Sequence, residues 1–247
     1  MKIKRIVKII LGVLVGYSIL YFVVQLFFKL ILAQRQTAVT IYQTDTALHF
    51  LPLFFSTFLI TSTLIIYFFN SWLEGKWIRV KWVQALLYMG TFAGAGPTGE
   101  VVVNSIARFF IHHSIWVYQF LPVHGGDTSM VMAVIWPLYG FHMYCFHAAL
   151  KAKHDKTTDF DMSLFVGIDA ITLEVIANIF TILFFYTYIF YYLAGDLYHL
   201  STALIFVPYV VCGYIVIKIL HFIEKKHHHI LFGIFGFLWG WLIIFFV

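Results

Sequence analysis

Two short motifs place a carboxylate and an amide four residues apart inside otherwise apolar sequence. The motif TGEVVVN contains Glu100 and Asn104, and the motif TLEVIAN contains Glu174 and Asn178. Charged side chains are costly in a bilayer, so acids within apolar spans usually face the protein interior and mark a functional site. Residues four apart share a helix face, so each motif predicts a polar stripe on one side of a helix.

Two carboxylates in one membrane site could bind a cation, relay a proton or act as a general acid towards a lipid-soluble substrate. Burial and a like-charged neighbour both disfavour the ionised form, so we expect at least one of the pair to be protonated. Arg108 extends the first stripe by one turn. If the two motifs face each other, the acids, the amides and this guanidinium converge on a cavity in the outer half of the membrane. The alternative is structural, with each acid bonding across helices or capping a carbonyl that a break at Pro97 exposes.

The elements that must position these residues are membrane helices. Of the 247 residues, 62% are hydrophobic and 11% are charged, whereas a soluble domain is about half apolar and about a quarter charged. Seven runs hold roughly the 20 apolar residues that cross a bilayer, and in lipid such runs must be helical. The runs cover residues 6–33, 47–70, 82–111, 129–150, 162–194, 200–223 and 229–247. The predicted fold class is an all-α integral membrane protein with seven transmembrane helices.

Lysine and arginine concentrate in alternate loops of this arrangement. They precede the first run, separate the second from the third, and follow the fourth and the sixth, while the other loops carry few. The positive-inside rule therefore predicts a cytoplasmic N-terminus, an outside C-terminus and a multi-pass protein of the cell membrane. Membrane orientation explains the net charge of +5, so we expect no nucleic-acid partner. The expected partners are membrane lipid and either other membrane subunits or further copies of the chain.

A shift of 74 residues without a gap superposes the third and fourth runs on the fifth and sixth. It matches Glu100 with Glu174, and it also matches a tyrosine with a tyrosine and His147 with His221. We interpret this as a duplicated hairpin with parallel copies related by an axis along the membrane normal; chance matching of apolar residues is the alternative. One transmembrane domain then divides into residues 1–80 (helices 1–2), 81–158 (repeat 1), 159–226 (repeat 2) and 227–247 (helix 7).

Aromatic and polar residues follow the motifs on the predicted outer side. Trp116, Tyr118 and Tyr192 suit an aromatic belt at the membrane interface. They could equally form a lid over the cavity, with His124 and His199 among the polar groups on that side. We therefore add these five residues to the candidate binding site.

The sequence predicts no metal site and no cofactor. It contains no HExxH, Walker, GxSxG or Cys-based zinc motif. His142 and His147 are five apart, which separates them around a helix, and haem ligation by one of these or by His221 is a minor alternative. Two glycine pairs, Gly12 with Gly16 and Gly236 with Gly240, have the GxxxG spacing that lets helices pack closely.

The repeated hairpins resemble a known membrane family. GEVVVNSIARFF, followed by WVY and IWPLYGF, is similar to the first hairpin of the transmembrane protein 229 family and its bacterial relatives, labelled ABC-transporter type IV (CmpB-like). TLEVIAN, FYY and FVPYVVCG are similar to the second hairpin. The resemblance covers roughly residues 95–220 and departs from the family at Phe190, where the family tends to have Trp. The same positions have a fainter similarity to membrane carotenoid hydratases.

These observations lead to three hypotheses. The first is a permease- or channel-like protein with a carboxylate and amide site between the hairpins and with Arg108 setting charge selectivity. The second is a membrane enzyme that acts on an isoprenoid or lipid by carboxylate acid catalysis, with aromatic rings stabilising a cation. The third is a non-catalytic accessory subunit of a larger complex. A polar vestibule favours the first, an apolar tunnel open to lipid favours the second, and paired glutamates without a cavity favour the third.

Overall fold

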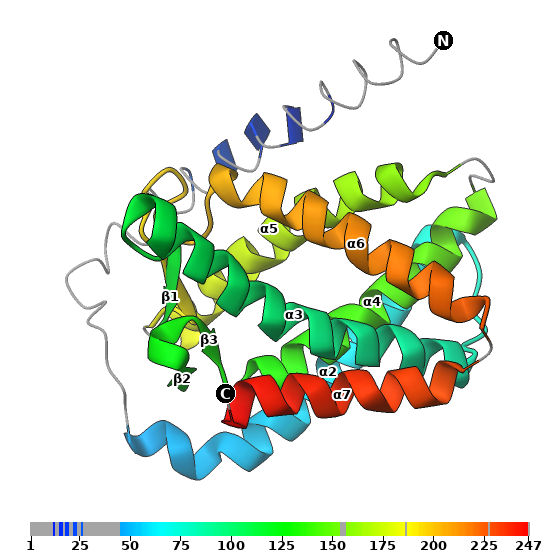
Figure 1. Cartoon of the computed structure of the whole chain (residues 1–247), viewed down its shortest axis with the longest axis horizontal. Coiled ribbons are helices and arrows are strands. Elements are labelled where there is room, and N and C mark those ends of the chain that lie inside the picture. Colours follow the sequence, from blue (N-terminus) through cyan, green and yellow to red (C-terminus); the bar gives the residue numbers. More distant parts are fainter. Residues whose placement is uncertain are drawn as a thin grey trace.

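The computed structural model describes residues 45–153, 157–185, 187–226 and 228–246, together with a few positions between 12 and 26. Helices dominate these ranges (Figure 1): α2 (Asp45–Glu74), α3 (Trp82–Ile111), α4 (Met132–Lys153), α5 (Asp159–Phe185), α6 (Phe206–Glu224) and α7 (His229–Phe246). Four short strands accompany them: β1 (Trp116–Tyr118), β2 (Pro122–Val123), β3 (Thr128–Ser129) and β4 (Phe190–Tyr192). Single 3₁₀ turns cover His124–Gly126 and Ala203–Ile205. The predicted span 6–33 lies largely outside the described residues.

Three segments of the described chain are long and apolar enough to cross a membrane. They are Asp159–Leu183, Ala203–Glu224 and His229–Phe246. Large apolar side chains on their outer surfaces are exposed, among them Leu204, Val207 and Leu231. Soluble proteins rarely expose continuous apolar surface of this kind, so the arrangement is compatible with a membrane protein.

The helices pack as two hairpins with two flanking helices. Helix α3 packs on α4, helix α5 packs on α6, α7 lies along α3, and α2 lies along α4. Apolar side chains from α3, α4 and α6 form one core cluster, and side chains from the strands and α5 form a second. The two hairpins therefore share an interior in which polar groups must find partners within the protein.

Three of the predicted spans are wrong at their ends. The span predicted over 200–223 begins as helix α6 only at Phe206, after a 3₁₀ turn. The span predicted over 162–194 ends as helix α5 at Phe185, and residues 190–192 instead form β4. The span predicted to start at residue 129 begins at Met132, after β3. At these ends the prediction followed the apolar residues beyond the helix. The backbone there instead forms hydrogen bonds with a neighbouring strand or with side chains. The prediction of a purely helical chain misses these strands.

The strands join the two hairpins at one end of the helices (Figure 1). Strand β1 follows α3, strand β4 follows α5, and the two pair antiparallel. The central pair joins Val117 to Tyr191, flanked by Trp116 with Tyr192 and by Tyr118 with Phe190. Residues 117 and 191 are 74 apart, so this register carries the same offset as the two glutamate motifs.

Helix α3 runs without interruption through Pro97, although the sequence suggested a break there. Proline removes the hydrogen bond to the carbonyl four residues earlier, which is that of Ala93. That carbonyl lies against Gly240 of α7, where an added Cβ would come within 2.0 Å of the oxygen. The adjacent Thr98 hydroxyl donates to the carbonyl of Gly94 at 2.7 Å. Close helix packing thus accommodates the freed backbone group.

Glycines allow α3 and α7 to come into backbone contact. A Cβ added at Gly236 would lie 2.1 Å from the carbonyl oxygen of Gly90, and one added at Gly90 would lie 2.0 Å from that of Gly233. The prediction of close packing is confirmed for Gly236 and Gly240. At Gly12 and Gly16 no atom of the described residues lies within 4 Å of an added Cβ.

We expect Gly236→Ala to separate α3 from α7, because the new methyl group would overlap the backbone of Gly90. Overpacking of this kind costs about 1–3 kcal/mol, so the Tm of the detergent-purified protein, followed by circular dichroism, should fall. The matched control is Gly99→Ala in α3, where no atom lies within 4 Å of the new Cβ. It should keep or raise the Tm, because alanine favours helix over glycine by about 1 kcal/mol. Equal Tm values for the two variants would contradict the close contact.

Candidate functional site

Glu174, in α5, is surrounded by hydroxyl donors from three other segments of the chain. Its Oε1 accepts hydrogen bonds from the hydroxyl of Tyr192 at 2.6 Å and from that of Tyr209. Its Oε2 accepts one from the hydroxyl of Ser201 at 2.6 Å. Three hydroxyl donors supply much of the solvation that an ionised carboxylate would receive from water.

Glu100, in α3, has fewer donors. Its Oε1 accepts hydrogen bonds from the hydroxyl of Tyr118 and from the indole of Trp136, the latter at 3.2 Å. Its Oε2 is buried without a partner that meets hydrogen-bond geometry, and so is the hydroxyl oxygen of Thr128. The side chains of Glu100 and Thr128 nevertheless lie within interaction range of each other. Oε1 of Glu100 thus accepts two hydrogen bonds, whereas Oε2 accepts none of standard geometry.

The two carboxyl groups belong to one cluster. Tyr118 donates to Glu100 and Tyr209 donates to Glu174, and each of these two rings also lies within electrostatic range of the other acid. No hydrogen bond that the structure records joins the two carboxyl groups directly. The members come from α3, α5, α6 and the segments between them, so the site lies where the two hairpins meet.

The two asparagines bind the backbone and not the acids. The amide of Asn104 donates to the carbonyl of Trp116 at 3.1 Å, and its oxygen accepts from the backbone N–H of Ile115 at 2.9 Å. Asn178 repeats both contacts eleven and twelve residues along the chain, at Ile189 and Phe190. It also donates to the carbonyl of Leu200 at 2.8 Å. Both side chains are fully buried, and they hold the segments that form β1 and β4.

Arg108 lies outside the glutamate cluster. Its guanidinium forms a two-pronged ion pair with the carboxylate of Asp127, and the side chain is 43% exposed. The backbone carbonyl of Asp127 in turn accepts from the indole of Trp116 at 3.1 Å. The arginine therefore ties the loop after β2 to the end of α3 and has no contact with either glutamate that the structure records.

The two candidate histidines also hold loops. A ring nitrogen of His124 lies 2.6 Å from the carbonyl of Ile243 in α7. His199 lies 2.6 Å from the carbonyl of Tyr192 and stacks on Tyr191 with ring centroids 4.2 Å apart. Of the predicted site residues, the structure brings the acids together with two tyrosines, and it uses the others to shape the surrounding segments.

Sequence reasoning missed several members of the cluster. Ser201, Tyr209 and Trp136 all bond to a glutamate, and none is part of the repeated motif. Trp136 and Tyr209 flank the prolines at the start of α4 and α6, where each returning helix passes the acids. That position next to a proline was the available signal. Nothing in the sequence indicated that Ser201 binds a glutamate, because a serine just before a helix is usually interpreted as an N-cap residue.

A second polar group lies between α2, α4 and α5. The carboxylate of Asp169 lies 3.1 Å from Nε2 of His142, and Nδ1 of the same ring lies 3.1 Å from the amide nitrogen of Asn70. The hydroxyl of Tyr139 is buried without a hydrogen-bond partner of standard geometry, and it lies within electrostatic range of Asp169 and Glu174. In the described part of the chain, this group is therefore near the glutamate cluster but not hydrogen-bonded to it.

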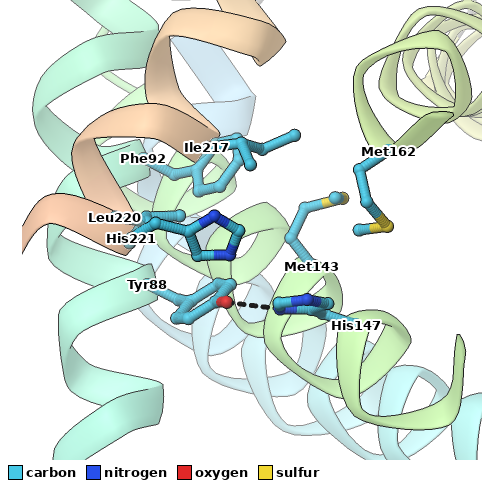
Figure 2. Close-up of a pocket in the computed structure, with 8 residues that line it drawn as sticks. All are labelled: Tyr88, Phe92, Met143, His147, Met162, Ile217, Leu220 and His221. Atoms are coloured by element: carbon cyan, nitrogen blue, oxygen red, sulfur yellow. Dashed lines mark hydrogen bonds between the residues drawn. The ribbon is translucent and has the colours of Figure 1, made fainter. Parts of the chain in front are cut away.

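A small cavity lies elsewhere between the helices (Figure 2). It is lined by Tyr88, Phe92, Met143, His147, Met162, Ile217, Leu220 and His221. In the described ranges, no three His, Cys, Asp or Glu side chains are grouped so that they could hold a metal ion.

Comparisons of the chain with family models, with curated proteins and with solved structures find no match. The interpretation of the site therefore rests on its own geometry.

We expect Asn178→Ala to destabilise the fold more than Asn104→Ala. The first change removes the partners of three or more backbone groups and the second removes the partners of two. Each buried group left without a partner costs about 1–3 kcal/mol. Hydrogen exchange followed by mass spectrometry should show faster exchange at residues 187–200 in the first variant and at 115–118 in the second. Unchanged exchange in both variants would contradict the anchoring role.

Proposed function

We propose that this chain is a permease-like, multi-pass protein of the cell membrane in which Glu100 and Glu174 form a proton-binding pair between two related hairpins. The observation that carries the proposal is the enclosure of two interacting carboxyl groups by tyrosine hydroxyls within an apolar helix bundle. Acids in such positions characterise proton relays and coupling sites in transporters. Two full charges would repel each other in this interior, so the uptake of one proton is the least costly change of charge.

The supply of donors supports unequal roles for the two acids. Glu174 accepts three hydroxyl hydrogen bonds, which suits the ionised form. Glu100 accepts hydrogen bonds of standard geometry only at Oε1, and its buried Oε2 lies beside the hydroxyl of Thr128 without one, so we assign the proton to this acid. In this resting state the pair holds one proton and one negative charge.

A proton route in this proposal would run from Glu174 past the hydroxyl of Tyr139 to Asp169 and His142, which are hydrogen-bonded to each other, and water would have to bridge the gap at Tyr139. Hydroxyl, carboxylate and imidazole groups can each pass a proton to a neighbour within hydrogen-bond reach. The route begins beside Glu174, which in this proposal is the acid that exchanges protons along it.

The related hairpins are part of the proposal. We infer a duplication because Asn104 and Asn178 bind backbone at the same offsets, and because each glutamate accepts from the tyrosine eighteen residues later. Seven membrane spans, a cytoplasmic N-terminus and membership of the transmembrane protein 229 or CmpB-like family fit this inference.

A membrane enzyme acting on an isoprenoid or lipid is the second candidate. It is favoured by the aromatic surroundings of Glu100, where Tyr118 and Trp136 bond to the acid and Tyr139 packs against Trp136 with ring centroids 5.8 Å apart. Such rings could stabilise a carbocation formed by protonation of an alkene. If the purified protein converts a polyprenyl substrate and Glu100→Gln abolishes this conversion, the result would support the enzyme over the permease.

Proton transport is tested in liposomes that contain the purified chain and a trapped pH-sensitive dye, with a potassium gradient and valinomycin as the driving force. We expect Glu174→Gln to lower the proton flux by at least about 100-fold, the lower range for removing a positioned proton-transfer group. The matched control is Glu74→Gln, which removes a carboxylate paired with Lys76 at the end of α2. A flux in Glu174→Gln equal to that of the control would contradict a role of this acid in transport.

The unequal protonation of the pair is tested by infrared spectroscopy in lipid. We expect the wild-type protein to show the C=O stretch of a buried protonated carboxylic acid at neutral pH. Glu100→Gln should remove this band, whereas Glu174→Gln should retain it. Loss of the band in Glu174→Gln alone would reverse the assignment, and its absence from the wild type would contradict a proton-binding pair.

A further inference from the structure

The cavity between α3, α4, α5 and α6 combines two imidazoles with two thioethers. His147 and Met143 come from α4, Met162 comes from α5, and His221 comes from α6. Met143 and His147 are four residues apart, so one face of α4 supplies both. The two histidine rings lie with centroids 5.7 Å apart, and all four side chains line the same space (Figure 2).

Each histidine is oriented by a partner on its Nδ1 atom. Nδ1 of His147 lies 2.5 Å from the hydroxyl of Tyr88, and Nδ1 of His221 lies 3.1 Å from the carboxylate of Asp159. In the described part of the chain, no hydrogen bond is recorded at Nε2 of either ring. Histidines that bind metals are held in this way, with the second ring nitrogen bonded to a carboxylate or another oxygen.

We propose that this cavity is a binding site for one Cu(I) ion, with His147, His221, Met143 and Met162 as its ligands. Thioether ligands select Cu(I) over harder ions, and imidazole accepts copper readily. Two imidazoles on one metal at about 2.0–2.1 Å have ring centroids roughly 5–6 Å apart, which agrees with the observed spacing.

The size and charge of the cavity favour a small monovalent guest. The space is about 10 Å³, enough for a single ion or water molecule and too small for an organic ligand. No carboxylate lines the cavity. Asp159 contacts His221 but is not a lining residue, and it also pairs with Lys218 at 2.6 Å. A divalent ion would keep more uncompensated charge in this apolar setting than Cu(I), and desolvating it would cost more.

The proposal does not depend on the glutamate pair. None of the residues that line the cavity accepts a hydrogen bond from, or donates one to, Glu100 or Glu174 in the described part of the chain. Copper binding should therefore persist in Glu100→Gln and Glu174→Gln, whatever those variants do to proton flux.

The test is an anaerobic titration of the purified full chain with Cu(I) in competition with the chromophoric chelator bicinchoninate. We expect one Cu(I) per chain, and we expect Zn(II) to bind at least 100-fold more weakly. The double variant Met143→Leu with Met162→Leu keeps the packed volume and should weaken Cu(I) binding by at least about 100-fold, beyond the 10–100-fold that loss of an orienting group typically costs. Asp159→Asn, which removes the carboxylate that orients His221 and that also pairs with Lys218, should weaken it by about 10–100-fold.

Met89→Leu is the matched control, because Met89 packs against the same core cluster without lining the cavity; it should bind Cu(I) as the wild type does. X-ray absorption of the loaded protein should show sulfur neighbours that the double variant lacks. Failure of the wild type to take Cu(I) from the chelator would overturn the proposal and leave a water molecule as the occupant. Equal affinity for Zn(II), or wild-type affinity in the folded double variant, would overturn it as well.

Discussion

A carboxylate inside an apolar helix bundle must receive its hydrogen bonds from the protein, because lipid offers none. This requirement shapes the centre of the chain. Glu174 is bonded by side chains from β4, from the loop before α6 and from α6 itself, so one acid fixes where three later segments lie. Replacement of these donors by apolar groups would leave the buried carboxylate without hydrogen bonds. Their presence offsets the cost of its burial and fixes the positions of the donor residues.

The same requirement applies to the backbone where the helices end. Residues after α3 and α5 leave helical geometry among apolar surroundings, and their N–H and C=O groups need partners. Asn104 and Asn178 supply them, and β1 and β4 then pair with each other. The asparagine amides therefore set the positions of Tyr118 and Tyr192, whose hydroxyls donate to Glu100 and Glu174.

The sequence predicted the elements whose signal is local and periodic. Apolar length located the helices from α2 to α7, and the motif spacing singled out both glutamates. Strand β4 was missed because its aromatic residues continue the apolar run of α5, and only the long-range pairing with β1 separates it. Ser201 and Tyr209 were missed for a related reason: they reach Glu174 across 27 and 35 residues, and no spacing rule reports a contact of that kind.

The two hairpins differ at the position that supplies Glu174 with its third donor. The 74-residue shift places Ser201, which donates to Glu174, opposite Asp127 in the first hairpin. Asp127 has no hydroxyl to offer and is paired with Arg108, which the same shift aligns with the apolar Ile182. Oε2 of Glu100 lies instead beside the hydroxyl of Thr128, without a hydrogen bond of standard geometry. Under the proposed duplication, this difference makes Glu100 the acid better suited to carry the proton.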